Sequence, residues 1–200
     1  IAPHLLSMSA TPIPRTLALT VFGDLDLTLL DAMPAGRKPI ITEIVSPDKR
    51  EKTYEHIREQ LAEGRQAYVI CPYIDDNEKS VIAEAARLKK DVFKEYEVGI
   101  LHGKMTSKAK DKAMLDFKSG KTHILCATSV VEVGVNVANA NVIIIEGGER
   151  FGLAQLLQLR GRVIRGTHQA YCYVFTDSGS EKTAERLKAL STAKNGFELA

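Results

Sequence analysis

The stretch AYVICPYIDDNEKSVIAEAARLKKDVFKEYEVGILH, residues 67 to 102, contains the alternation that decides the fold. Short apolar runs at its two ends, residues 67–71 and 98–102, lack strict polar alternation. This pattern is typical of strands buried on both faces of a parallel sheet. Between the runs, apolar residues recur at helical spacing over 78–93, which predicts a helix. The stretch is therefore predicted to form a strand, a helix and a second strand.

The same alternation continues in both directions along the chain. Gly64 and Gly120 each follow a predicted helix, at the position where a left-handed backbone favours glycine. Repeated strand–helix units with right-handed crossovers predict an α/β fold, a parallel sheet with flanking helices, which binds ligands beyond the carboxyl ends of its strands. Further strands are predicted over 4–8, 41–45, 123–127, 141–145 and 170–175, and further helices over 49–62, over 106–118 and from 178 onward.

Composition limits the classes of protein to which this sequence could belong. Lys and Arg number 27 against 25 Asp and Glu, and 44% of the residues are hydrophobic, which indicates a globular domain without general basic character. The apolar runs are too short to span a bilayer, so we expect a soluble protein without a membrane partner. Cys71, Cys126 and Cys172 lie in separate apolar runs, which favours buried reduced thiols and a cytoplasmic location. They show no metal-ligand spacing, and no metal site is expected.

A break in the pattern suggests the domain organisation. Residues 31–40, DAMPAGRKPI, contain two prolines and a glycine and are typical of a linker. We therefore expect 1–33 to end a preceding domain, 34–40 to be the linker, 41–192 to form one α/β domain, and 193–200 to begin a further segment. The chain is expected to be part of a longer polypeptide.

Two features resemble nucleotide-site motifs only superficially. The stretch SGKT at 119–122 would need glycine in place of Leu115 to complete a phosphate loop, and it lies between a helix and a strand rather than the reverse. Glu146 ends an apolar strand, as a metal-site carboxylate would, but without a phosphate loop beside it a structural role is favoured. The chain therefore lacks its own apparatus for holding a triphosphate and Mg²⁺.

The stretch QLRGRVIRG, residues 158–166, concentrates Arg160, Arg162 and Arg165 after a short predicted helix. One interpretation is a solvated basic helix end, with the arginines facing outward, which the helix dipole favours. The other is an arginine finger, a charge that stabilises phosphoryl transfer on a nucleotide held by another domain. The absence of a phosphate loop is compatible with the second interpretation.

Four stretches together resemble successive motifs of superfamily 2 helicases, and within them the RecG family of bacterial branch-migrating DNA helicases. These are SATPIPRT followed by PAGRKPI (9–16 and 34–40), LHGKM (101–105), ATSVVEVGVNVANANVIIIE (127–146) and ERFGLAQLLQLRGRVIRG (149–166). The resemblance implies two RecA-like motor lobes with ATP and Mg²⁺ between them, of which this chain holds the tail of the first lobe and all of the second. It implies an ATP-dependent double-stranded DNA translocase that remodels branched DNA, with DNA, ATP and the remaining domains of the polypeptide as partners. The fragment alone is expected to be inactive.

The resemblance also implies roles for individual residues. Arg162 and Arg165 would be catalytic, contacting the γ-phosphate, while Gly134, Asn136 and Gln158 would bind ATP. Contacts with DNA, or coupling of DNA to the nucleotide, are implied for Thr11, Arg15, His102, Lys104, Thr128 and Ser129. Simpler alternatives stay open for some of them: an ordinary loop histidine for His102, a strand-end hydroxyl for Thr11 and, for the neighbouring Arg150, an ion pair within the fold.

Two positions depart from the helicase pattern. Ile164 stands where glycine is usual, which affects the aim of Arg165 more than that of Arg162, and Asn136 stands where aspartate is frequent. Two alternatives remain: a motor lobe like that of the transcription-repair coupling factor, which shares ATPIPRTL and the arginine motif, or a degenerate RecA-like module that binds nucleic acid without catalysis.

Overall fold

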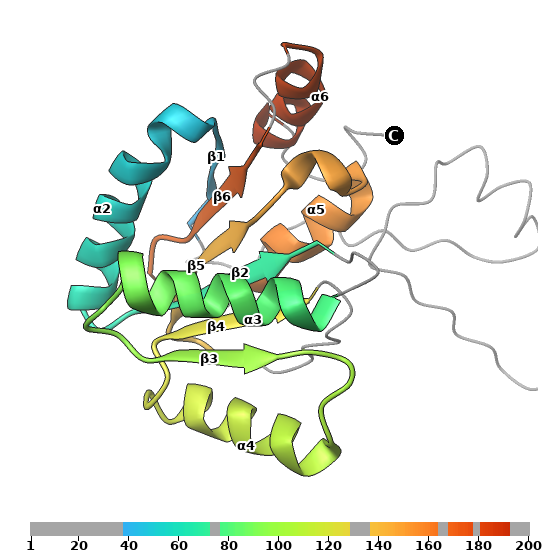
Figure 1. The fold of residues 1–200 in the computed structure, drawn as a ribbon. Helices are drawn as coiled ribbons and strands as arrows, with labels where there is room; N and C mark the ends of the chain where they lie inside the picture. The colour runs from blue at the N-terminus through green and yellow to red at the C-terminus, as the bar shows by residue number, and fades with distance from the viewer. Residues whose placement is uncertain (1–37, 73–76, 129–136, 164–167, 178–180, 193–200) are drawn as a thin grey trace, which may run out of the picture.

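A computed structural model describes residues 38–72, 77–128, 137–163, 168–177 and 181–192 (Figure 1). The predicted strands and helices in these ranges are confirmed, with bounds that differ by one residue in most cases. The strands are β1 (Ile41–Val45), β2 (Gln66–Cys71), β3 (Val98–Leu101), β4 (Ile124–Thr128), β5 (Ala140–Ile145) and β6 (Tyr171–Phe175). The helices are α2 (Arg50–Ala62), α3 (Asn77–Arg87), α4 (Ser107–Lys118), α5 (Leu153–Arg160) and α6 (Glu181–Thr192). The helix predicted over 78–93 ends in a π-helical turn, Leu88–Val92, and the strand predicted over 4–8 lies outside the described residues.

The strands form one parallel sheet in the order β1-β6-β5-β2-β4-β3. The connections through α2 and α3 run toward the β3 edge, and those through α4 and α5 run back toward the β1 edge. Because parallel crossovers are right-handed, the two pairs of helices must lie on opposite faces of the sheet. The predicted parallel sheet with flanking helices is therefore confirmed.

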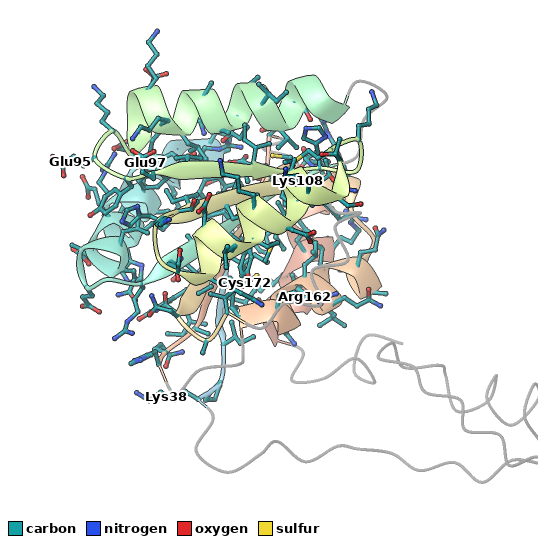
Figure 2. The ribbon with its side chains drawn as sticks, turned by 90° about the horizontal axis from the view of Figure 1, so that it is seen from below. Lys38, Glu95, Glu97, Lys108, Arg162 and Cys172 are labelled. Atoms are coloured by element: carbon teal, nitrogen blue, oxygen red, sulfur yellow. The ribbon has the colours of Figure 1, made fainter. Side chains whose placement is uncertain are left out.

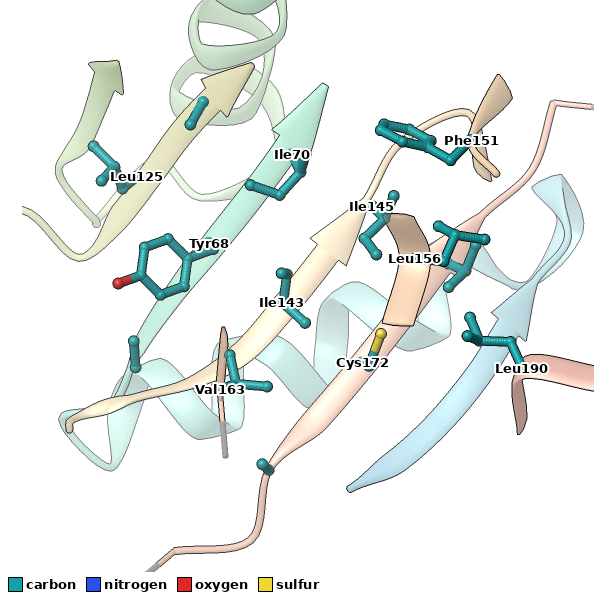
Figure 3. Packing of buried hydrophobic residues seen from close by; sticks show 14 of the residues in the cluster. Tyr68, Ile70, Leu125, Ile143, Ile145, Phe151, Leu156, Val163, Cys172 and Leu190 are labelled. Atoms are coloured by element: carbon teal, nitrogen blue, oxygen red, sulfur yellow. The ribbon is translucent and has the colours of Figure 1, made fainter. Parts of the chain in front are cut away.

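The core consists of two apolar layers, one on each face of the sheet, as the alternation of side chains along β2 shows. Val69 packs with Tyr54 and Ile57 of α2 on one face. Tyr68 points to the other face, where it packs with Phe117 of α4 in a cluster that includes residues of α5 and α6 (Figure 3). Both faces of the strand are buried, which explains why residues 67–71 form an apolar run rather than an alternating one.

Local signals in the sequence are borne out at the helix ends. Gly64 and Gly120 both adopt φ of +79°, the left-handed conformation predicted for them. The side chain of Thr106 caps α4 by accepting a hydrogen bond from Ala109 N at 3.3 Å. The three cysteines are buried and free, as predicted. No helix in the described ranges is long and apolar enough to cross a membrane.

Candidate functional site

The carboxyl edge of the sheet brings two of the predicted residues together. The register pairs Leu101 of β3 with Ala127 of β4, so the next residues along, His102 and Thr128, lie beside each other where these two strands end. Adjacent strands are about 5 Å apart. Thr128 is only 3% exposed and pairs in register with Cys71 of β2. The sequence placed these residues in separate motifs, and the parallel pairing makes them neighbours.

The loop between β3 and α4 is shaped by contacts of its own. Met105 N donates to His102 O at 3.2 Å, and His102 N contacts Met105 Sδ at 3.4 Å. Lys110, from the first turn of α4, reaches back and donates to Gly103 O at 2.8 Å. These bonds close a tight turn that leaves His102 half-buried and Lys104 exposed at its tip. The turn therefore carries Lys104 in the loop directly after β3.

The arginine-rich segment is held against the sheet by apolar anchors. Leu156 of α5 and Val163, in the 3-10 turn Gly161–Val163, are both buried in the cluster shown in Figure 3. Arg162 lies directly before Val163 and is half-buried, and Gln158 is exposed on α5. Anchors on both sides fix the backbone that carries these two side chains. The backbone that carries Arg162 is therefore packed against the sheet by buried residues on both sides.

The expectation that all the arginines face outward is wrong for Arg160. Its side chain is half-buried, and its Nη1 donates to Leu190 O in the last turn of α6 at 2.8 Å. Burial lowers the pKa of Arg160 from its ordinary value. The interaction ties α5 to the carbonyl end of α6, where a positive charge is favourable. The physical reason is tertiary: α6 packs over α5 and covers this side chain.

A second polar cluster lies at the carboxyl ends of β1, β5 and β6. Arg50 Nη1 is 3.3 Å from Glu146 Oε2, and Arg50 Nη2 donates to Asp177 Oδ1 at 2.8 Å. Arg150 Nη2 is 3.8 Å from Asp177 Oδ2. This contact agrees with the alternative that gave Arg150 an ion pair within the fold, and the pairing of Glu146 agrees with its structural interpretation. The role of Arg50 was missed, because nothing in its local sequence indicates which strand ends it will face.

Burial dominates the electrostatics of Glu146. Loss of solvent, reinforced by the charge of Glu84, raises the pKa of Glu146 to about 7, although Arg50 favours the ionised form. In the described part of the chain, no group of three His, Cys, Asp or Glu side chains could hold a metal ion. The expectation that this chain has no metal site stays a prediction.

Five of the eleven predicted site residues lie within the described part of the chain. His102, Lys104, Thr128, Gln158 and Arg162 are placed by the structure as described above. His102, Lys104 and Thr128 lie at the carboxyl edge of β3 and β4. Gln158 lies on α5, and Arg162 lies just after it. The predictions for Thr11, Arg15, Ser129, Gly134, Asn136 and Arg165, and the departure at Ile164, lie outside the described residues.

Comparisons with known proteins agree with this arrangement. Residues 48–167 match the family described as Helicase conserved C-terminal domain. The chain is 46% identical to the ATP-dependent DNA helicase RecG of Synechocystis over 100% of its own length and 24% of that protein, and 46% identical to that of Bacillus subtilis over 98% of its length and 30% of that protein. It thus spans about a quarter to a third of the curated relatives it matches. The resemblance to RecG helicases is confirmed, and the coupling-factor alternative is not favoured.

Solved structures give the same result for the fold. A structure of RecG bound to a three-way DNA junction matches with a TM-score of 0.81 and 44% identity, covering 96% of this chain and 26% of that one. Domain 2 of the DEAD-box helicase Mss116p, bound to an RNA duplex, matches with a TM-score of 0.54 at 18% identity, covering 76% of this chain and 70% of that one, and supports the fold alone. The RecA-like architecture predicted for 41–192 is therefore shared with helicase C-terminal lobes.

Proposed function

We propose a function that follows from the family to which this chain belongs, the Helicase conserved C-terminal domain. The chain forms the C-terminal motor lobe of an ATP-dependent translocase that remodels branched DNA. One observation carries the proposal. An arginine-bearing segment is anchored rigidly on the sheet by Leu156 and Val163, in a chain without a phosphate loop of its own. Such a segment is suited to act on a nucleotide that another lobe holds.

On this proposal, Arg162 and Arg165 supply positive charge to the γ-phosphate when the two lobes close. A guanidinium has a fixed charge and a planar fork of donors that matches phosphate oxygens. Gln158, Gly134 and Asn136 complete the nucleotide contacts from this side. ATP is bound together with Mg²⁺, and both are held mainly by the other lobe. An arginine supplied in this way contributes on the order of 10³ to 10⁵ in rate.

The carboxyl edge of β3 and β4 is the proposed DNA contact. His102, Lys104, Thr128 and Ser129 bind phosphate oxygens, which positions DNA without reading its sequence. Thr11 and Arg15 couple this contact to the nucleotide state. Closing and opening of the lobes with each ATP would then move the protein along duplex DNA. The partners are DNA, ATP and the other domains of the polypeptide, and the location is the bacterial cytoplasm.

The test replaces the arginines in the full-length protein. Arg162→Ala and Arg165→Ala are each expected to lower kcat of DNA-stimulated ATP hydrolysis by roughly 10³-fold or more, with little change in DNA affinity. Arg162→Lys keeps the charge but loses the planar fork, and should recover only part of the rate. Arg58→Ala on α2, which covers the opposite face of the sheet, is the matched control and should retain wild-type hydrolysis.

Unchanged hydrolysis in both alanine variants would contradict the arginine-finger assignment. Retained DNA binding in such variants would instead support a nucleic-acid-binding module without catalysis from this lobe. A loss confined to Arg162→Ala would mean that Ile164 directs Arg165 away from the nucleotide.

A further inference from the structure

The positive charge of this chain is concentrated on α4 and the loop before it. Residues 102–121 contain six Lys and two Asp, a net charge of +4, whereas the whole chain carries only +2. The remaining residues together are therefore slightly acidic. Helix α2 and its C-cap, residues 50–63, contain three basic side chains against four Glu, a net charge of −1. The basic character of α4 is thus a local feature and not a property of the surface in general.

Two of these lysines form a stripe on the solvent face of α4, and a third lies in the loop before the helix. Lys104, Lys108 and Lys112 are exposed and spaced four residues apart, so the two on the helix lie one turn above the other. The opposite face of α4 packs on the sheet through Phe117, which is fully buried. Figure 2, which views the molecule from below, labels Lys108 on this helix.

The other lysines of the segment are engaged or lie farther along the helix. Lys110 donates to Gly103 O at 2.8 Å, and Lys121 is 3.9 Å from Asp116. In contrast, Lys108 and Lys112 form no ion pair with any residue that the structure describes, and this includes Asp111 on the same helix. Two cations held on a rigid helix without acidic partners are available to an external anion.

We propose that Lys108 and Lys112 bind the phosphate backbone of duplex DNA, so that α4 extends the contact of the loop at Lys104. The inference rests on the proposed function, because it assumes that DNA passes the carboxyl edge of β3. Helix α4 begins directly after that loop and is continuous with it. The two lysines are about 6 Å apart along the helix axis, while phosphates of one DNA strand advance about 3.4 Å per nucleotide. Flexible lysine stems can therefore reach separate phosphates.

Hydrogen bonds at both ends of α4 hold the helix that carries the two lysines in place. Gln66 Nε2 donates to Phe117 O at 2.6 Å and to Thr122 O at 2.7 Å, which ties the C-terminal end of α4 to the start of β2. Thr106 caps the other end of the helix. Because both ends are fixed, the lysines need no rearrangement of the backbone before they bind. Leu115, 65% exposed on the same face, marks where the stripe ends.

The experiment measures the salt dependence of duplex binding by the full-length protein. Each phosphate contact contributes about 0.9 to the slope of log K against log salt concentration. Lys108→Gln with Lys112→Gln is therefore expected to reduce the slope by about 2 and to weaken binding by roughly tenfold or more at 0.1 M salt. Glutamine is a good helix former, so α4 should persist. The double Arg variant, which restores the charges, should recover the wild-type slope.

The control is Lys90→Gln with Lys94→Gln, two exposed lysines with the same spacing in the segment that leads from α3 to β3. This variant should keep the wild-type slope. A wild-type slope in the Lys108 and Lys112 double variant, with a wild-type protein that binds DNA and hydrolyses ATP, would overturn this inference and leave the proposed function intact. A wild-type protein that neither binds duplex DNA nor hydrolyses ATP would overturn the proposed function itself.

Discussion

Glu146 illustrates how a single residue acquires its chemistry from the fold. Its Oε2 faces Arg50 at 3.3 Å, whereas its Oε1 is buried without a hydrogen-bond partner among the described residues. An ionised carboxylate in this position is stabilised on one side only. Burial accordingly raises its pKa to about 7, well above the ordinary value of 4.5. The folded protein therefore binds a proton at this site under conditions in which the unfolded chain does not.

This shift predicts a pH-dependent stability. Between pH 4.5 and 7 the folded state binds more protons than the unfolded state, so the contribution of Glu146 to the free energy of unfolding falls as pH rises and is constant above that window. Glu146→Gln removes the titration. Urea unfolding should show the variant gaining stability relative to the wild type between pH 5 and pH 8, by roughly 3 kcal/mol at most.

Glu95→Gln is the control for the loss of one negative charge, because Glu95 is exposed in the turn before β3. A difference between Glu146→Gln and wild type that does not change from pH 5 to pH 8 would show that the carboxyl is already ionised throughout this range. In that case the ion pair with Arg50, rather than burial, would control its titration.

At the scale of elements, buried hydrogen bonds decide how α4 sits on the sheet. Gln66 is 3% exposed, and its amide satisfies two carbonyls at the end of α4 and the turn that follows. Backbone carbonyls buried without a donor cost about 1–3 kcal/mol each. The side chain at the start of β2 thus holds a helix whose sequence position is about fifty residues away.

Replacement of Gln66 by Met tests this tie, since Met has a similar shape and no strong donor. Gln66→Met is expected to lower the free energy of unfolding by about 1–3 kcal/mol, because Thr122 O loses the amide donor while Phe117 O keeps its hydrogen bond from Gly120 N. Ser119→Ala at the same end of the helix removes an exposed hydrogen bond to Asp116 O and should cost less than about 0.5 kcal/mol. Thermal or urea unfolding compares the two, and equal small losses would mean that water replaces the amide.

At the scale of the whole molecule, the proposed function requires a nucleotide site that is completed by another lobe. Gly120 is in a left-handed turn at the end of α4, and β4 follows, so SGKT lies between a helix and a strand as the sequence indicated. It therefore has neither the strand-to-helix geometry nor the glycine pattern of a phosphate loop. On the proposed function, the arginine segment after α5 would therefore act on a nucleotide that another lobe holds.

The chain by itself is accordingly expected to hydrolyse no ATP. Without a phosphate loop it lacks the backbone donors that hold the triphosphate, and charge from Arg162 has no bound substrate to act upon. Phosphate release by the purified 200-residue chain should equal that of a protein-free blank, with or without duplex DNA. The full-length protein, assayed in parallel, is the positive control. Measurable turnover by the chain alone would contradict this account of a divided site.

Most of the fold was predictable from sequence because its signals are local. Continuous apolar runs such as residues 141–145 identify strands buried on both faces. Gly64 and Gly120 mark helix ends, because glycine adopts the left-handed backbone conformation without steric cost. The motif order also pointed to helicases before any contact was known. The arginine segment and the absence of a phosphate loop could be recognised from the sequence for the same reason, because each depends on residues close together in the chain.

Only the tertiary structure decided the strand order and the partners of individual side chains. The sequence around Arg50 does not predict that its side chain pairs with Glu146 and Asp177. These residues become its neighbours because β1, β6 and β5 are adjacent in the sheet. Likewise, Arg160 is covered by α6, thirty residues farther along, and so differs from Arg162 two positions away. Sequence by itself determined the elements and the chemistry available, since propensity and periodicity act over a few residues. Packing determined which charges are paired and which remain exposed, because burial and ion pairing depend on contacts between distant segments.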